Sequence, residues 1–436
     1  MPTTNDRLLL IKNGRLLDPA SKTDARHDVL LHGPRVVRVG PDLTSSDAEV
    51  FDATDMIVAP GFIDLHCHLR EPGQELSETI VTGTRAAVRG GFTAVCCMPN
   101  TQPVNDTASV TSGIVERAAS AASARVWPIG AASVGSKGEA LAEIRAMKDA
   151  GIVAVSDDGR PIATARLVRQ VMDYCNALGL PVIEHCEDTS LAAGGVMREG
   201  PQSVRLGLKG IPAESESICA GRDVEVAALT GAHLHIAHMS TRGSLEHVRA
   251  AKRRGLHVTC EVTPHHFTLI DEDVRYDPNY KMNPPLASRA DRDALIEGLA
   301  DGSVDAIATD HAPHHPGSKD VEFDRAPFGI IGFETALALG LSELVHSGRI
   351  PLMRLVELFT TGPARVLGME RKIAAGEPAD LTIFSTDLKW TFRAAESASK
   401  SRNTPFDGRE FRGGPVATIV AGRIVGRRPL EARAGD

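Results

Sequence analysis

Histidines and acidic residues recur along the chain at points where short apolar runs end. The first of these runs, residues 61–70 (GFIDLHCHLR), ends in His66 and His68, which are separated by one residue. Side chains two residues apart on a β-strand point to the same face, so the two imidazoles are expected side by side. Imidazole is a favoured ligand for zinc and related metals. The pattern favours a metal site, with two hydrogen-bonded core or groove histidines as the alternative.

Later apolar runs end in residues of the same ligand types. The candidates at these ends are Asp158, His185, His238 and Asp310. Together with His66 and His68 they supply four imidazoles and two carboxylates, enough for two metal ions that share a bridging carboxylate. Taken singly, His185 and His238 could be hydrogen-bonded core histidines and Asp158 a turn or capping residue. Their joint occurrence at successive strand ends favours the metal centre.

The chemistry that such a centre suits is attack of hydroxide on a carbonyl. Metal ions make hydroxide available near neutral pH and polarise the carbonyl. A carboxylate beside them can take the proton and pass it to a leaving nitrogen, and Asp310 is the candidate for this role. The remaining histidines are interpreted as packing or surface residues; they include His233, His235, His265 and His266.

The elements that must position these residues follow an alternating pattern. Continuous apolar runs, typical of parallel strands buried on both faces, alternate with amphipathic segments such as 79–89, 163–178 and 216–229. Eight such strands are predicted, at 61–69, 92–98, 125–131, 152–156, 181–185, 233–238, 257–262 and 304–309. The pattern predicts an α/β fold, a (β/α)8 TIM-type barrel with its active site at the carboxyl ends of the strands.

Both ends of the chain have hairpin-like patterns instead. Segments 8–17 and 27–39 before the barrel, and 379–385, 415–420 and 423–427 after it, read as short strands separated by turn residues. The predicted organisation is therefore a small composite β-sandwich from residues 1–56 and 370–436, attached to a barrel at 57–369.

Composition excludes several classes of protein. The 436 residues carry a formal net charge of -8, with 42% hydrophobic and 24% charged residues, and show no basic stripe of the kind that binds nucleic acid. No apolar run reaches the roughly 20 residues that span a membrane, and no signal pattern precedes the first strand. Seven cysteines without a Cys-x-x-Cys pair fit small core residues in a reducing compartment. A cytoplasmic protein without a nucleic-acid or membrane partner is expected.

Several motifs together resemble the bacterial class I dihydroorotases of the amidohydrolase superfamily. They are GFIDLHCHLREPG from residue 61, MPNT from 98, SDDG from 156, EVTPHH from 261, KMNPPL from 281, ATDHAPH from 308, APFGI from 326 and GEPADLTIF from 376. The resemblance spans the predicted barrel and both flanks. It implies reversible, metal-dependent cyclisation of N-carbamoyl-L-aspartate to L-dihydroorotate in de novo pyrimidine biosynthesis.

The resemblance also implies a role for individual residues. The metal ligands would be His66, His68, Asp158, His185, His238 and Asp310, holding one or two zinc ions, with two bridged by Asp158 as the expected arrangement. Asp310 would also be the general base and acid. Substrate contacts would come from His68, Arg70, Asn100, Asn283 and His314, and from the backbone of Phe328 and Gly329. A guanidinium suits the substrate carboxylate, and an amide such as that of Asn283 suits the ring amides.

Two departures from the family pattern bear on these roles. Many relatives bridge their metals with a carbamylated lysine at the end of strand 4, whereas residues 152–159 contain none. Either Asp158 takes that place or only one metal binds tightly. Position 287, where the family often has arginine, is Ala287. The consequence of that change for a substrate or subunit contact stays open.

Two alternative functions follow from the same motifs. One is another cyclic-amide hydrolase, such as a hydantoinase or allantoinase; Arg70, Asp158 and the 327–329 loop favour dihydroorotase over it. The other is a non-catalytic scaffold of aspartate transcarbamoylase, which the complete ligand set disfavours. The resemblance leaves open a homo-oligomer and an active complex with aspartate transcarbamoylase.

Overall fold

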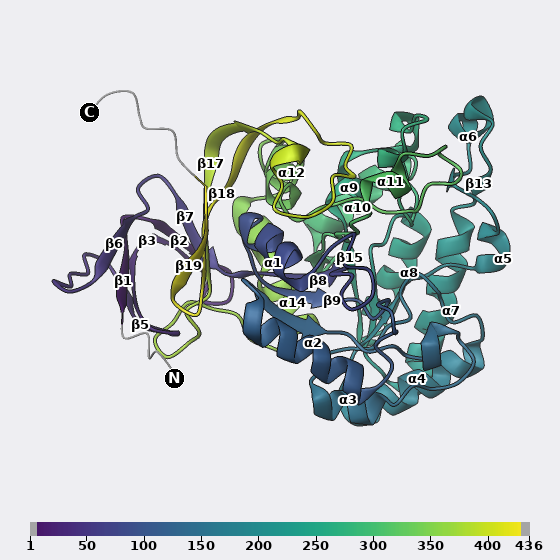
Figure 1. Ribbon diagram of the computed structural model, residues 1–436, viewed down its shortest axis with the longest axis horizontal. Coiled ribbons are helices and arrows are strands. Elements are labelled where there is room, and N and C mark those ends of the chain that lie inside the picture. Colours follow the sequence, from purple (N-terminus) through teal and green to yellow (C-terminus); the bar gives the residue numbers. More distant parts are fainter. Residues whose placement is uncertain (1–6, 429–436) are drawn as a thin grey trace.

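The computed structural model describes residues 7–428, and its larger part is an α/β arrangement of parallel strands among helices (Figure 1). Strands β10, β9 and β8 pair in parallel, as do β11, β14, β15 and β16. Their bounds are β8 (Phe62–Cys67), β9 (Phe92–Cys97), β10 (Arg125–Pro128), β11 (Val182–Glu184), β14 (Leu234–Ile236), β15 (Val258–Val262) and β16 (Ala306–Ile307). Every residue of β8 and β9 is buried, as their continuous apolar sequence predicted.

Isolated parallel bridges join these two groups of strands. Val155 bridges Gly130, just after β10, and Val182 in β11, while His311, after β16, bridges Cys67 in β8. The regular strand predicted at 152–156 is wrong in extent, because Val155 alone makes these bridges. The following turn is anchored by the Asp157 carboxylate, which accepts hydrogen bonds from the backbone N–H groups of Ala132 and Ser133 at 2.9 and 3.1 Å.

Helices follow most of these strands. The longer ones are α1 (Ile80–Arg89), α2 (Ala108–Ala121), α3 (Ile144–Ala150), α4 (Ala165–Leu178), α7 (Glu214–Thr230), α8 (Arg242–Arg253), α10 (Arg289–Asp301) and α13 (Leu352–Phe359). The side chains of Thr79, Thr164 and Thr241 cap α1, α4 and α8 by accepting a backbone hydrogen bond in the first turn. The helices predicted at 79–89, 163–178 and 216–229 are thus confirmed as α1, α4 and α7.

Shorter elements lie in the connections. They are α5 (Thr189–Ala192), α6 (Pro201–Leu206), α9 (Pro264–Thr268), α11 (Pro316–Lys319), α12 (Ala336–Gly340), α14 (Thr361–Val366) and the two-residue strands β12 (Met197–Arg198) and β13 (Gly210–Ile211). Several of them follow the carboxyl ends of the parallel strands, where the predicted site residues are also found.

Two further sheets form the other part of the molecule, seen at the left of Figure 1. One has the order β5-β4-β1-β6 and the other β19-β18-β17-β7-β2-β3. Their bounds are β1 (Leu8–Lys12), β2 (Arg15–Asp18), β3 (Thr23–Arg26), β4 (Asp28–His32), β5 (Arg35–Gly40), β6 (Glu49–Asp52), β7 (Ile57–Pro60), β17 (Leu381–Thr391), β18 (Glu410–Val420) and β19 (Arg423–Arg427). Both chain ends contribute to the six-stranded sheet, as predicted. β7 pairs with β2 and β17 in that sheet, although it begins at residue 57, where the sequence placed the start of the barrel.

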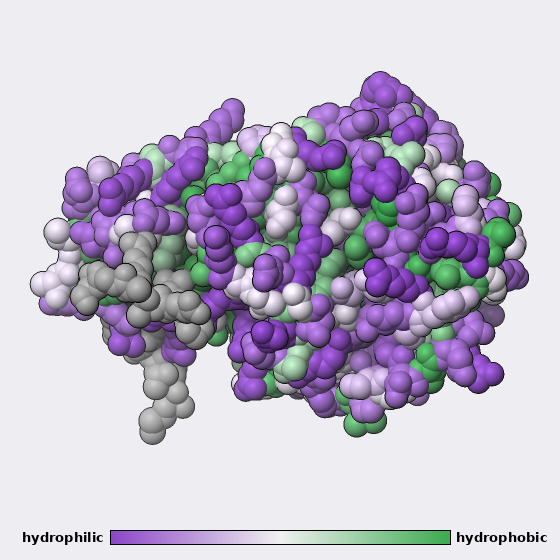
Figure 2. Space-filling model, turned by 90° about the horizontal axis from the view of Figure 1, so that it is seen from above, coloured by the Kyte–Doolittle hydropathy of each residue, from purple (hydrophilic) through white to green (hydrophobic). Residues whose placement is uncertain are grey.

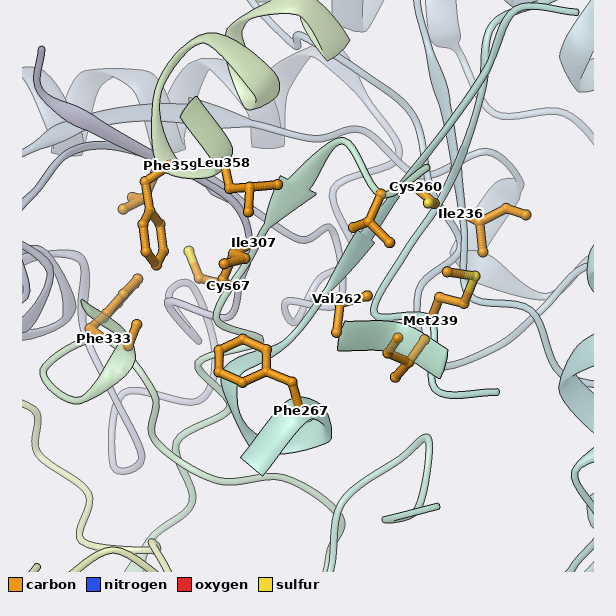
Figure 3. Close-up of a cluster of buried hydrophobic side chains, with 14 of the residues drawn as sticks. Cys67, Ile236, Met239, Cys260, Val262, Phe267, Ile307, Phe333, Leu358 and Phe359 are labelled. Atoms are coloured by element: carbon orange, nitrogen blue, oxygen red, sulfur yellow. The ribbon is translucent and has the colours of Figure 1, made fainter. Parts of the chain in front are cut away.

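Separate hydrophobic clusters support the two parts. Residues of both flanking sheets share one cluster, which includes Ile11, Val29, Leu381 and Ile419. A larger cluster lies among the parallel strands and helices, and Figure 3 draws part of it, with Phe267, Ile307, Phe333 and Phe359 close together. The surface seen in Figure 2 is mostly hydrophilic, with hydrophobic residues in scattered groups. Within residues 7–428, none of the helices has the length and apolar character needed to cross a membrane.

Candidate metal centre

His66, His68 and Asp310 converge at the carboxyl ends of the first and last parallel strands. His66 lies within β8 and His68 just beyond it, and their ring centroids are 5.4 Å apart. Asp310 Oδ1 is 3.0 Å from His68 Nε2 and 3.7 Å from His66 Nε2. These distances bring the three side chains together, as the sequence pattern suggested. All three are buried.

Asp158, His185 and His238 complete the predicted set from the neighbouring strand ends. Asp158 Oδ1 lies 3.3 Å from His66 Nε2 and 3.4 Å from His238 Nε2. His185 Nδ1 lies 2.9 Å from His238 Nε2 and 3.8 Å from Asp158 Oδ1. The other oxygen of Asp158, Oδ2, is 3.7 Å from His68 Nε2. The two oxygens of this carboxylate therefore face histidines from both halves of the site.

The arrangement fits metal ions better than a network of hydrogen bonds. His66, His68 and Asp310 form one group whose ligand atoms all lie within 4.8 Å of one another, and His66, Asp158 and His238 form a second. His66 Nε2, which faces Asp158 and Asp310, is buried without a hydrogen-bond partner within the described chain. Buried polar atoms are rarely left in this way unless an ion or a water satisfies them. The residues present thus fit the metal dependence that the sequence resemblance implies.

The backbone at the strand ends is held in an uncommon conformation. Arg70, His238 and Asp310 have φ angles of 61, 31 and 44°, in the left-handed region that residues other than glycine seldom occupy. Such conformations cost free energy and persist where the surrounding structure fixes them, often at functional sites. Here they turn the chain sharply at the point where these side chains enter the site.

The carboxylates of the site are held ionised. Burial by itself would raise the pKa of Asp310, but its hydrogen bond from His68 and the charges of His66 and His68 lower that pKa. The pKa of Asp158 is also well below its usual value because the effects of His66 and His238 outweigh that of burial. Ionised carboxylates are the form in which aspartate binds a metal.

A second layer of residues behind the site includes Glu261, a role that the sequence reasoning missed. Its Oε1 lies 3.2 Å from His66 Nδ1, and its Oε2 lies 3.2 Å from Nε2 of His235. His235 therefore belongs to this layer rather than to the site itself, consistent with its interpretation as a packing residue. The position of Glu261 near the end of a predicted strand was the signal that could have indicated it.

Two of the predicted substrate-binding residues lie beside the centre. Asn100 Oδ1 is 2.9 Å from His68 Nδ1, on the ring atom opposite the one that faces Asp310. Asn283 Nδ2 donates to Glu187 Oε2 at 2.9 Å and lies 3.3 Å from His185 Nε2. Asn100 thus lies beside His68, and Asn283 lies beside His185.

Arg70 lies close enough to Asp310 and Asp158 to interact with their charges. It is buried and donates from Nε to the carbonyl of Pro313 at 3.1 Å, so the opposite edge of its guanidinium remains for a ligand. Desolvation lowers its pKa to about 10, still far above neutrality, so the side chain keeps its positive charge. A buried guanidinium is a suitable partner for a carboxylate.

His314, Phe328 and Gly329 form one hydrogen-bonded unit. His314 Nε2 donates to the Phe328 carbonyl at 2.7 Å, and the Gly329 N–H donates to the carbonyl of Lys281 at 2.9 Å. Burial lowers the pKa of His314 to about 3, so its ring is neutral with Nδ1 as an acceptor. To contact a carboxylate as predicted, His314 would have to gain a proton or turn its ring.

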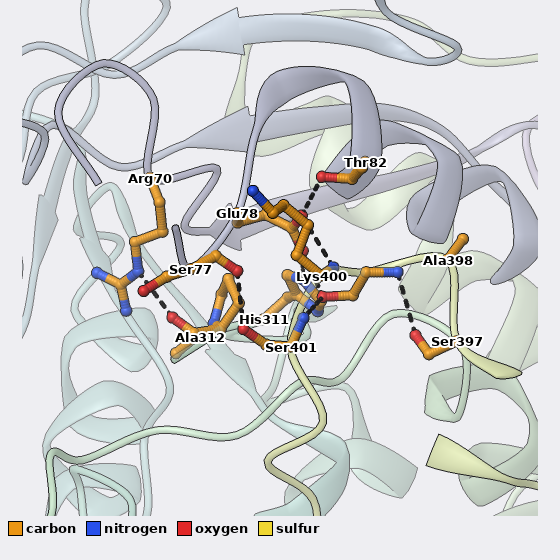
Figure 4. A network of polar contacts seen from close by, with 12 residues as sticks. Arg70, Ser77, Glu78, Thr82, His311, Ala312, Ser397, Ala398, Lys400 and Ser401 are labelled. Carbon is orange, nitrogen blue, oxygen red and sulfur yellow. Dashed lines mark hydrogen bonds and ion pairs between the residues drawn. The ribbon is translucent and has the colours of Figure 1, made fainter. Parts of the chain in front are cut away.

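A late segment of the chain, residues 397–403, braces the loops around this site. Ser399 Oγ donates to Glu78. The Glu78 carboxylate lies 3.4 Å from Nε2 of His311, the residue after Asp310, and both are labelled in Figure 4. Ser401 Oγ donates to the carbonyl of Ser77 at 2.7 Å. The sequence placed 370–436 in the flanking module and did not predict this contact with the site.

Comparison with known proteins agrees with this geometry. A family model described as "Dihydro-orotase-like" matches residues 55–244. The chain is 58% identical over 418 residues to a protein named dihydroorotase from Solibacter usitatus, covering 95% of this chain and 97% of that one. It is 52% identical to a dihydroorotase from Pelotomaculum thermopropionicum, covering 96% and 98%. The chain belongs to the dihydroorotase family.

Solved structures of a hydantoinase and a dihydropyrimidinase have a similar fold. An L-hydantoinase from Arthrobacter aurescens has a TM-score of 0.86 at 26% identity and covers 96% of both chains. A dihydropyrimidinase from Brevibacillus agri has a TM-score of 0.84 at 26% identity, covering 96% of this chain and 95% of that one. The shared fold extends over nearly the whole of this dihydroorotase-family chain, flanking sheets included.

Proposed function

We propose that this member of the dihydroorotase family is a cyclic-amide hydrolase that interconverts N-carbamoyl-L-aspartate and L-dihydroorotate in de novo pyrimidine biosynthesis. The observation that carries the proposal is the buried set of four histidines and two aspartates, in which Asp158 lies between histidines of both halves of the site. A buried arginine beside this set supplies the positive charge that a substrate carboxylate requires.

For the metal we propose two zinc ions, bridged by Asp158. His66, His68 and Asp310 would hold one ion, and His185 and His238 the other. When bound, such ions lower the pKa of a water and polarise the carbonyl under attack. The short distances from Asp158 to His66 and His238 support its role as the bridge in place of a carbamylated lysine.

The chain's own residues would orient the substrate and move a proton. Arg70 binds the ring carboxylate, with Asn100 beside it, and the amide of Asn283 pairs with the ring amide groups. Asp310 takes the proton released in the attack and delivers it to the departing ring nitrogen. In the biosynthetic direction the same carboxylate takes a proton from the carbamoyl nitrogen.

We also propose the finer architecture that suits this chemistry. The parallel pairings, closed by the bridges at Val155 and His311, support a (β/α)8 barrel at 57–369 with the site at the carboxyl ends of its strands. The two flanking sheets and their shared cluster support the composite β-sandwich predicted from 1–56 and 370–436 as far as residues 7–428 are described, with β7 moved to it from the start of the predicted barrel.

The two rival functions each lack a specific supporting observation. The hydantoinase-like structures share the fold at 26% identity, whereas the relatives named dihydroorotase share 52–58% of their sequence with this chain. A non-catalytic scaffold does not require a complete ligand set, and all six predicted ligands are buried together here. We also propose that the protein acts in the cytoplasm. Two kinds of partner are to be tested, a second copy of the chain and aspartate transcarbamoylase.

Ring opening of L-dihydroorotate by the purified chain, with zinc added and again after chelation, tests the proposal. Turnover that is lost on chelation and restored by zinc is the expected result. Hydantoin and allantoin are assayed in parallel, and faster opening of either one would assign the chain to the rival class. Turnover that appears only after aspartate transcarbamoylase is added would indicate that the complex is the active form.

A further inference from the structure

A second buried cluster of ligand-type side chains lies between β11 and helix α7, apart from the centre described above. We propose that Cys186, Cys219 and Asp223, together with Glu184, form a binding site for a zinc ion. The ligand atoms of the two cysteines and Asp223 all lie within 4.8 Å of one another, the same closeness as in the two groups of the main centre.

The sequence spacing brings these residues to one place. Glu184 ends β11, and Cys186 lies two residues beyond it. Cys219 and Asp223 are four residues apart on α7 and therefore lie on one face of that helix. The end of β11, the segment after it and helix α7 thus supply the four side chains, and all four are at most 3% exposed.

The distances within the cluster match those of a zinc site. Asp223 Oδ2 lies 3.5 Å from Cys219 Sγ and 3.9 Å from Cys186 Sγ. Zinc bonds of about 2.3 Å to sulfur and 2.0–2.2 Å to oxygen, at a tetrahedral angle, separate the two ligand atoms by about 3.5–3.7 Å. A zinc ion would therefore need only small shifts of these side chains.

Glu184 supplies an independent indication of a missing partner. Its Oε1 is buried and has no hydrogen-bond partner within the described chain, a costly arrangement for a carboxyl group. Two carboxylates, Glu184 and Asp223, lie in this apolar layer. Arg222 is the cation that contacts the cluster, donating to Asp223 Oδ1 at 2.8 Å and to Cys219 Sγ at 3.4 Å. A divalent cation would give the unpartnered Glu184 Oε1 a bonding partner.

The two sites differ in ligand chemistry, which makes them separable by experiment. The main centre consists of histidine and aspartate, whereas the second cluster supplies two sulfur ligands. On binding, the thiols would lose their protons to solvent and bind as thiolates. Cobalt(II) substituted for zinc absorbs strongly in the near ultraviolet only where thiolates bind it. The absorption of the cobalt-substituted chain therefore reports on the second cluster alone.

The test uses the full chain loaded with cobalt(II), with metal content measured in parallel. We expect a thiolate-to-cobalt band in the unaltered chain and in a variant with His66→Ala and His68→Ala, which removes the main centre. Cys186→Ser and Cys219→Ser should each lose the band and about one equivalent of metal per chain. Cys260→Ala, a buried cysteine outside the cluster, is the matched control and should keep both.

Three results would overturn the site. The first is the absence of a thiolate band in the unaltered chain, a measurement that does not depend on the folding of any variant. The second is a band that persists in both serine variants, and the third is a band that Cys260→Ala removes.

Discussion

Glu261 lies 3.2 Å from Nδ1 of His66, on the side of the ring that faces away from Asp158 and Asp310. Burial would raise the pKa of Glu261, but hydrogen bonds with His235 and His66 lower it to about 2, so the carboxylate is ionised. A carboxylate at the outer nitrogen of a metal-binding histidine fixes its tautomer and increases its basicity. Glu261 thus directs the Nε2 lone pair of His66 toward the candidate metal site.

Replacement of this carboxylate should weaken metal binding. For Glu261→Gln we expect a fall in metal affinity of about 10- to 100-fold, because the neutral amide no longer increases the basicity of His66. Bound metal is measured during titration with a chelator. Glu297→Gln, at an exposed position of α10, is the control and should leave the affinity unchanged. Equal affinities for the two variants would refute the role of Glu261.

Asp310→Asn should abolish turnover without unfolding the chain. The change is nearly isosteric, yet the amide cannot accept the proton that must reach the leaving nitrogen. We expect a fall in kcat of at least about 100-fold, the lower end of what general acid–base groups contribute. Circular dichroism and metal content should be recorded alongside. Substantial residual turnover in a variant that keeps its metal would remove Asp310 from proton transfer.

Arg70 should act on substrate binding more than on the chemical step. Arg70→Met removes the guanidinium that we place against the ring carboxylate, and KM should rise by at least about tenfold, since charged hydrogen bonds contribute about 1.5–3 kcal/mol. Arg70→Lys keeps the positive charge but cannot make a bidentate contact with a carboxylate, so an intermediate KM is expected. An unchanged KM in Arg70→Met would contradict the carboxylate contact.

Sequence reasoning anticipated which side chains lie together where the signal was local. His66 and His68 were placed together by the two-residue period of a strand, and Asp310 by its position at the end of another. Glu261 and Asn403 were missed because their partners, His66 and His314, lie far away in sequence. The regular strand at 152–156 was overestimated because apolar composition does not determine how many ladder hydrogen bonds a short segment makes.

Asn403 holds together the two loops that carry His314 and Gly329. Its Nδ2 donates to the carbonyls of Ala312 and Gly329 at 2.9 and 3.0 Å, and its Oδ1 accepts from the His314 N–H at 3.2 Å. Asn403→Asp removes the Nδ2 donor, so the carbonyls of Ala312 and Gly329 face a carboxylate oxygen instead. We expect KM to rise while the metal content stays unchanged.

The control for this prediction is Asn176→Asp, at an exposed position of α4 remote from the site. It should leave KM as it is. If Asn403→Asp changed kcat and metal content but not KM, Asn403 would support the ligands rather than the substrate loops.

Asp380 joins the flanking sheets to the α/β part of the molecule. Its carboxylate is buried and accepts hydrogen bonds from Arg125 Nε and Nη2 at 2.7 and 3.1 Å and from the Ala421 N–H at 2.8 Å. Arg371 lies 3.3 Å away. Since Arg125 is in β10 and Asp380 directly precedes β17, the pair ties the two parts together.

Asp380→Asn should therefore destabilise the chain by about 2–3 kcal/mol, less than a fully buried pair because Arg125 is partly exposed. Burial would raise the pKa of Asp380, but its bonds with Arg125 and Arg371 lower it. The ion pair thus contributes fully above the ordinary carboxyl pKa of about 4, and its contribution is lost as the pH falls below that value. The measurement is thermal unfolding at pH 7 and pH 3. The Tm of the variant should lie well below that of the unaltered chain at pH 7 and closer to it at pH 3. The control is Asp387→Asn, which breaks an exposed pair with Arg412 and should change the Tm little at either pH. An equal fall in Tm for the two variants would contradict the role of Asp380.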